Sequence, residues 1–307
     1  MNKIISCVPN ICEGKDQKFI DDLVLKLKTV KDLTVLDVSR DSVRNRTVFS
    51  FTGTQEAMFE AGLLLYRETL AHIDMREHHG EYPRLGAVDV FPFVPLKDAT
   101  LEETVAMSTA FAQKVAEEFK IPVYLYGESA RFPMRRYVEN IREGEYEGLE
   151  NKLKDPRWKP DFGPSTFNPA SGATIIGARY PMISFKAFLD TPEEAVAEYI
   201  SRLIQHAGGG LAHVNAYAGL DSEHKAAQIT LTIANYRAMP MYRALEMLRS
   251  EARRFGVTVR KVEMIGLVPE TAFIESAFYY MGIQDFCCDK ILERKIQTDL
   301  DEQNRPS

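Results

Sequence analysis

The order in which β-rich and helical segments follow one another limits the fold of this chain more than any other feature. The expected elements are a strand at 3–9, a helix capped by Asp16, strands at 33–38 and 47–52, a helix at 55–72 and a strand at 86–94. The apolar stripes expected to face the sheet are Ile20, Leu23, Val24 and Leu27 in the first helix and Phe59, Leu63, Tyr66 and Leu70 in the second. This order is that of a ferredoxin-like unit, a sheet covered by helices on one face.

A further helix and strand extend this unit, and a second half repeats the plan. Thr100 and Glu103 have the spacing of a capping box, and residues 122–127 form the next strand. The second half is expected to hold a strand at 173–188, a helix opened by Thr191 and Pro192 with Glu194 completing a capping box, strands at 212–218 and 226–233, a helix at 241–255, a strand at 257–264 and a helix at 270–281. The sequence therefore predicts an α+β protein with two ferredoxin-like subdomains, residues 1–180 and 181–307, whose β-sheets face each other across a ligand groove.

Composition and charge argue against several classes of protein. The chain has 307 residues and a formal net charge of −6 at pH 7, without the basic excess of a non-specific nucleic-acid surface. No window approaches the ~18 apolar residues of a membrane span, and Pro9 cuts short the N-terminal apolar run. We therefore expect a cytoplasmic protein without nucleic-acid or membrane partners. Cysteine spacing predicts free thiols and no metal site, the cysteines being Cys7, Cys12, Cys287 and Cys288.

Two irregular segments hold most of the candidate functional residues. The central loop, residues 74–90, contains two histidines, four carboxylates and two arginines, and Gly80, Pro83 and Gly86 mark turns within it. Such a loop is either a solvated connection or a rigid polar scaffold for binding and catalysis. Residues 128–172 also lack clear periodicity, and their arginines, tryptophan and prolines favour a functional segment over a linker. The arginines are Arg131, Arg135, Arg136 and Arg142.

Several motifs, in one order along the chain, resemble the glutamate formimidoyltransferases. In the central loop the matching residues are Asp74, Met75, His78, Gly80, Glu81, Pro83, Arg84, Gly86, Ala87, Asp89 and Val90. Further matches lie at 7–10, 13–14, 36–38, 45–48, 122–128, 144–146, 161–165, 172–174 and 177–179, with weaker resemblance after residue 190. The resemblance implies a folate-dependent one-carbon transferase that moves a formimino group from N-formimino-L-glutamate to tetrahydrofolate. It also implies a monofunctional homodimer that lacks a cyclodeaminase domain and uses tetrahydrofolate as a substrate.

The resemblance further implies which residues bind the substrates. In the family, the segment that matches residues 163–172, called the second loop below, contacts the folate. Its residues are Gly163, Pro164, Ser165, Thr166, Phe167, Asn168, Pro169, Ala170, Ser171 and Gly172. Its hydroxyls and its aromatic ring suit a flat heterocycle. Arg84, Arg46 and Arg179 are candidate partners for glutamate carboxylates, because a guanidinium group can bond both oxygens, although each could equally form a surface ion pair.

Tyr82 stands where the family places its catalytic histidine. A histidine can take the proton from nitrogen-5 of tetrahydrofolate and give one to the departing amine, whereas a phenol ionises only near pH ~10 and is a poor base. Ser39 replaces a family acid, and the strand at 185–189 lacks the family asparagine. The candidate catalytic residues are therefore Tyr82, His79 and Glu81, with His79 as the proton relay and Tyr82 as a hydrogen-bond donor.

Two other interpretations stay open. In the first, the protein is a folate-binding relative that acts on the formyl group of 5-formyltetrahydrofolate or that has lost catalysis. Alternatively, the two ferredoxin-like units form a non-enzymatic binding or assembly module. Stabilisation by folinic acid distinguishes a folate protein from such a module, because a ligand that binds only the folded state raises the melting temperature.

Overall fold

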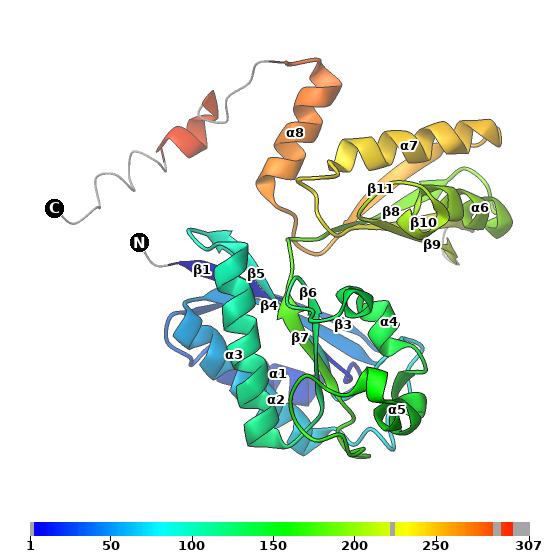
Figure 1. Cartoon of the computed structure of the whole chain (residues 1–307). Helices are drawn as coiled ribbons and strands as arrows, with labels where there is room; N and C mark the ends of the chain where they lie inside the picture. Colours follow the sequence, from blue (N-terminus) through cyan, green and yellow to red (C-terminus); the bar gives the residue numbers. More distant parts are fainter. Residues whose placement is uncertain (1–2, 222–224, 285–289, 297–307) are drawn as a thin grey trace. The chain divides into compact units, whose positions relative to one another are not determined.

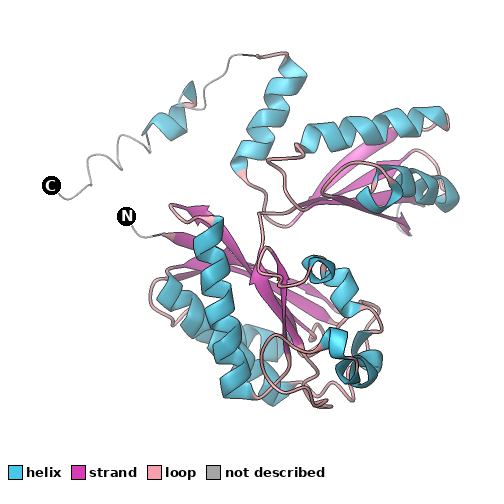
Figure 2. Cartoon of the chain, in the orientation of Figure 1, coloured by secondary structure: helices cyan, strands magenta, loops and turns pink. Residues whose placement is uncertain are grey.

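The computed structural model describes residues 3–221, 225–284 and 290–296 of the chain. The chain divides into two compact units, Met1–Pro181 and Met182–Ser307, called unit 1 and unit 2 (Figure 1). Each unit combines one sheet with helices, which confirms the α+β class (Figure 2). The expected groove between facing sheets stays a prediction.

Unit 1 is built on a seven-stranded sheet with the order β1-β4-β2-β5-β7-β6, and β3 pairs with β4 at its edge. The strands are β1 (Ile4–Cys7), β2 (Asn10–Ile11), β3 (Leu33–Asp41), β4 (Arg46–Gly53), β5 (Val88–Lys97), β6 (Val123–Gly127) and β7 (Thr174–Ala178). β1 and β2 both pair antiparallel with β4 and β5, as two parts of one strand. With α1 (Gln17–Leu27) and α2 (Gln55–His72), these strands form the predicted ferredoxin-like unit.

Both faces of the sheet are covered where β7 and β6 extend it as parallel strands. One core lies beneath α1, α2 and α3 (Leu101–Phe119) and includes Leu125 of β6. The preceding residue, Tyr124, lies in another core with residues of α4 (Val138–Arg142) and α5 (Glu145–Lys154), on the opposite face of the sheet. The expectation of helices on one face only is therefore wrong at this end, because parallel strands are generally buried on both faces.

Unit 2 has a four-stranded antiparallel sheet with the order β11-β8-β10-β9, again the order of a ferredoxin-like unit. Its strands are β8 (Ile183–Leu189), β9 (Val214–Asp221), β10 (Ala226–Ile233) and β11 (Val259–Ile265). Alternate residues of β8 and β10 form a core with apolar residues of the helices. These helices are α6 (Glu194–Ile204), α7 (Met241–Arg254) and α8 (Glu270–Met281), and short 3-10 helices are η1 (Pro133–Arg136) and η2 (Pro156–Trp158) in unit 1 and η3 (His206–Gly208) in unit 2.

Two expected elements differ in the structure. The strand expected at 173–188 is in fact β7 and β8, which belong to different units and are separated by a stretch that contains Pro181, a residue unable to donate to a ladder. The capping box expected at α6 is wrong: Thr191 accepts a hydrogen bond from the Glu193 backbone N–H (3.2 Å), and α6 begins after it without a side-chain cap. The box of Thr100 and Glu103 at α3 is confirmed.

Cys7 and Cys12 are buried free thiols, as predicted. Cys287 and Cys288 lie outside the described residues. Within the described part of the chain, no helix combines the length and the apolar character needed to cross a membrane.

Candidate functional site

The central loop connects α2 to β5 and is joined to the second loop by backbone hydrogen bonds. Met75 N–H donates to the Ala170 carbonyl (2.8 Å), and Ala87 N–H donates to the Ser171 carbonyl (2.9 Å). A Cβ atom on Gly86 would lie 2.4 Å from the backbone oxygen of Ser171, so the close approach of the two loops requires glycine there. The two segments predicted to form the site therefore lie side by side.

His78 is buried inside the central loop, and both of its ring nitrogens are bonded. Nε2 donates to the Asn45 carbonyl (3.0 Å), and Nδ1 accepts from Arg84 Nε (3.4 Å), which fixes the neutral tautomer. Burial lowers the pKa of His78, and the nearby Arg84 cation acts in the same direction. Asn45 also donates to the carbonyl of His79 (3.1 Å), whose side chain is exposed. Of the two adjacent histidines, His79 is therefore the one available for proton transfer.

Arg84 is buried, and its charge is already compensated by two carboxylates from α5. Its Nη1 donates to Glu145 (3.1 Å) and its Nη2 to Glu147 (2.7 Å). An open pocket of about 520 Å³ is lined by His79, Gly80, Arg84, Gly144, Glu145 and Glu147. This pocket brings His79 and Arg84 together, but none of the second loop's residues, all of which are described, lines it.

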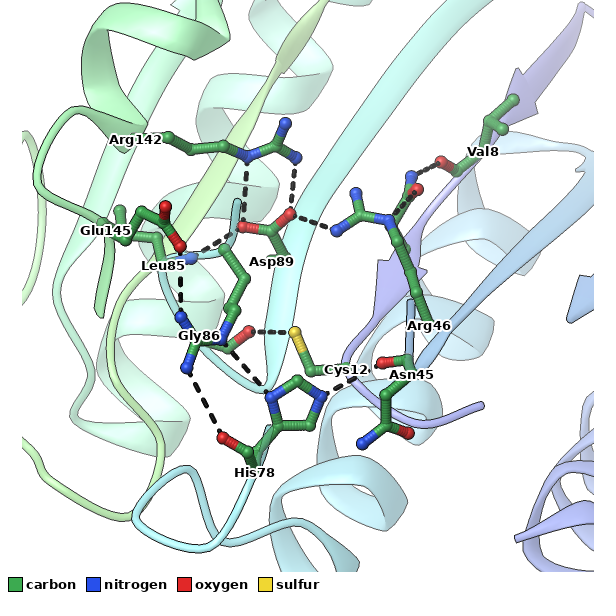
Figure 3. Close-up of polar contacts among 12 residues, drawn as sticks. Val8, Cys12, Asn45, Arg46, His78, Leu85, Gly86, Asp89, Arg142 and Glu145 are labelled. Carbon is green, nitrogen blue, oxygen red and sulfur yellow. Dashed lines mark hydrogen bonds and ion pairs between the residues drawn. The ribbon is translucent and has the colours of Figure 1, made fainter. Parts of the chain in front are cut away.

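Asp89 is fully buried on β5 and is held by two arginines from distant parts of the chain (Figure 3). Arg46 Nη1 donates to one carboxylate oxygen (2.7 Å), and Arg142 donates to both oxygens. The backbone N–H of Leu85 supplies a further hydrogen bond (2.9 Å). Burial alone would raise the pKa of Asp89, but the Arg142 and Arg46 guanidinium groups hold it below its usual value. Asp89 is therefore a carboxylate that fixes both arginines.

Tyr82 lies over the guanidinium groups of these two arginines. Its ring centroid is 4.3 Å from Arg46 Cζ and 5.4 Å from Arg142 Cζ. Two guanidinium groups against the single carboxylate of Asp89 leave one excess positive charge beneath Tyr82. Arg46 also bonds Asn10 through Nε (3.0 Å), so among the described contacts Arg46 Nη2 and Arg142 Nη1 have no partner.

The other predicted residues are more scattered. Arg179 is partly buried directly after β7. Burial raises the pKa of the Tyr126 hydroxyl, and the guanidinium groups of Arg179 and Arg142 oppose this rise. Phe167 of the second loop packs against Tyr146 at 5.5 Å between ring centroids. Glu81 is exposed. Gly163, Ser165, Thr166 and Pro169 of the second loop are also exposed, Pro164, Phe167, Asn168 and Ala170 are partly buried, and Ser171 and Gly172 are buried.

Arg142 is the main residue that the sequence did not identify as part of the site. The only signal for it was the concentration of arginines in residues 128–172. The two glutamates that pair with Arg84 were likewise not predicted, although Glu145 lies in the motif at 144–146. Residues of α4 and α5 therefore complete the arrangement that begins in the central loop.

Two profiles of one protein family match the chain. The profile described as "Formiminotransferase domain, N-terminal subdomain" matches residues 4–179, and "Formiminotransferase domain" matches residues 195–300. The glutamate formimidoyltransferase of Streptococcus pyogenes serotype M1 is 39% identical over 297 residues, which cover 96% of this chain and 99% of that protein. The glutamate formimidoyltransferase of Thermoplasma acidophilum is 39% identical over 296 residues, with 96% and 97% covered. The formimidoyltransferase-cyclodeaminase of Rattus norvegicus is 38% identical over 295 residues, covering 94% of this chain and 53% of that protein.

Proposed function

Because the chain belongs to the formiminotransferase family, we propose that the central loop and the second loop form its active site. The protein is an enzyme, a transferase of the glutamate formimidoyltransferase type, which moves a formimino group from N-formimino-L-glutamate to tetrahydrofolate. The alternative of a non-enzymatic module is therefore set aside. Tetrahydrofolate is a substrate, and we further propose that the enzyme acts as a homodimer in the cytoplasm.

The hydrogen bonds that join the two loops, next to the cluster of Asp89 with two arginines, carry this proposal. Nitrogen-5 of tetrahydrofolate attacks the formimino carbon, and the tetrahedral adduct then expels the glutamate amine. Nitrogen-5 must lose a proton and the amine must gain one, so a single relay can serve both steps. His79 is exposed in the pocket and takes this role. Tyr82, which lies over Arg46 and Arg142, donates a hydrogen bond to the adduct.

The excess positive charge beneath Tyr82 suits a carboxylate of the glutamate part of the donor. Arg46 Nη2 and Arg142 Nη1 have no partner among the described contacts and supply two N–H donors of the kind that bind a carboxylate. Arg84 is a weaker candidate than the sequence suggested, because Glu145 and Glu147 already neutralise it. We therefore assign substrate binding to Arg46 and Arg142. Arg84 instead holds the residues that line the pocket in place.

Formimino transfer is measured directly as tetrahydrofolate-dependent release of glutamate from N-formimino-L-glutamate, followed by mass spectrometry. His79→Asn removes the relay, and we expect its kcat to fall by ~10²–10⁴-fold. His206→Asn changes another exposed histidine, in unit 2, and serves as the matched control. Wild-type protein that releases no glutamate would contradict the proposed function, whereas an unimpaired His79→Asn variant would contradict only the role of His79.

A further inference from the structure

Lys152 of α5 donates to the last carbonyls of α4. Its Nζ lies 2.6 Å from the Ile141 carbonyl oxygen and 3.4 Å from that of Asn140. The same ammonium group lies 4.2 Å from the ring centroid of Trp158. A cation in this position satisfies carbonyls that have no partner within the helix and interacts favourably with the helix dipole.

The helix that Lys152 caps ends at Arg142. α4 has five residues, and a helix of one turn is not stable by itself, so its contacts with the rest of the protein hold it in place. Ile141 is fully buried and anchors one side of the turn. The carbonyl that Lys152 holds belongs to the residue directly before Arg142, whose guanidinium group bonds Asp89 and lies under Tyr82. A shift of this turn would displace the guanidinium group.

We propose that Lys152 is a positioning residue for the transferase: by holding the C-terminal carbonyls of α4, it fixes Arg142 against Asp89 and beneath Tyr82. The inference rests on the proposed function, because Arg142 and Tyr82 affect turnover only if the active site includes them. Lys152 itself need not touch either substrate. A charge-assisted hydrogen bond is about twice as strong as a neutral one, so the cap is strongest while the amine is protonated.

The surroundings of Lys152 place its titration within the range of an assay. Burial lowers the pKa of Lys152 to about 8, the Glu143 carboxylate opposes this shift and the Arg135 guanidinium adds to it. Arg135 is itself paired with Asp161, and η2 presents the ring of Trp158. The cap therefore weakens as the pH rises through about 8.

Folding stability changes with pH in the opposite direction. Because an unfolded lysine titrates near ~10.4, the folded protein loses this proton first, and the free energy of unfolding rises with pH between the two values. Titration of Lys152 cannot therefore lower activity by unfolding the protein. A loss of kcat through this range without a fall in melting temperature would therefore reflect a shift of Arg142 and not unfolding.

The test measures kcat and both KM values across the pH range around 8 for the full-length wild type, Lys152→Met and Lys152→Arg. Lys154→Met is the matched control, because Lys154 lies on the same helix but is exposed and pairs with Glu150. We expect Lys152→Met to lower kcat by ~10–100-fold, since a small misplacement of catalytic groups can cost this much. Lys152→Arg keeps its charge, so its kcat should not fall above pH 8 as that of the wild type does.

Two readouts are independent of turnover. Trp158 is the only tryptophan of the chain, so its fluorescence should show a transition near pH 8 in the wild type that is absent in Lys152→Met. Hydrogen exchange of the α4 amides should be faster in Lys152→Met and unchanged in Lys154→Met. Unchanged exchange, or wild-type kcat in Lys152→Met, would overturn the inference, as would a loss of kcat fully accounted for by a lower melting temperature. An inactive wild type would instead contradict the proposed function, and exchange would still decide the role of Lys152.

Discussion

Replacement of Asp89 by asparagine should destabilise unit 1 severely. The carboxylate is fully buried, accepts hydrogen bonds from Leu85, Arg46 and Arg142, and is the counter-ion of both arginines. Asparagine keeps the volume but leaves two buried cations without a counter-ion. Removing one partner of a buried ion pair costs ~3–5 kcal/mol, and we expect Asp89→Asn to lie in this range.

Urea unfolding followed by tryptophan fluorescence measures this loss in unit 1, because the only tryptophan, Trp158, belongs to it. The control is Glu118→Gln, which breaks the exposed pair with Arg67 and should cost less than ~1 kcal/mol. The lowered pKa of Asp89 adds a pH test: its contribution is present above the unfolded carboxyl pKa of ~3.9 and is lost as the pH falls through the lower folded value. Asp89→Asn should lack this acid dependence, and a variant about as stable as Glu118→Gln would refute the reasoning.

Three further predictions concern turnover and binding. In the His79→Asn background, Tyr82→His restores an acid-base group and should raise the rate of glutamate release by ~10²–10⁴-fold, whereas an unchanged or lower rate would show that Tyr82 supports a different chemistry. Folinic acid should raise the wild-type melting temperature, and Gly86→Ala should reduce this shift because its Cβ would meet a backbone oxygen at 2.3 Å. Equal shifts in the two proteins would show that the packing of the two loops does not affect folate binding. Glu147→Gln should raise the KM for N-formimino-L-glutamate more than the KM for tetrahydrofolate, with the exposed Glu150→Gln as control, and equal effects of both variants would contradict a role for Glu147.

The sequence predicted the position of α2 but not the side that it buries. Its bounds, Gln55–His72, agree with the expected helix at 55–72. Of the expected stripe, Tyr66 is fully buried, while Phe59, Leu63 and Leu70 are only partly buried. Apolar residues occur around most of this helix, so periodicity alone gives no clear direction. Close packing decides it: a Cβ atom on the helical glycine Gly62 would lie 2.4 Å from the ring of Phe111 in α3, a contact between distant residues that local pattern cannot reveal.

The site shows the same limit. The resemblance implied that the central loop and the second loop act together, and backbone hydrogen bonds do join them. The motifs could not show which of His78 and His79 is buried, since this depends on the Asn45 carbonyl, supplied by the β3–β4 connection. Nor could they pair Asp89 with Arg142, residues 53 positions apart whose contact depends on where α4 packs.

The charges around the central loop are unequally distributed, and the inequality matches the donor substrate. Beneath Tyr82, two guanidinium groups face one carboxylate and leave a positive excess. Around Arg84, one guanidinium faces Glu145 and Glu147 and leaves a negative excess in the pocket that holds His79. N-formimino-L-glutamate carries its basic amidine on the α-nitrogen, next to the α-carboxylate, and its γ-carboxylate lies at the far end of the side chain. If the γ-carboxylate binds Arg142, the amidine can point towards His79. There the negative excess would stabilise the protonated amidine, which makes its carbon more open to attack by nitrogen-5.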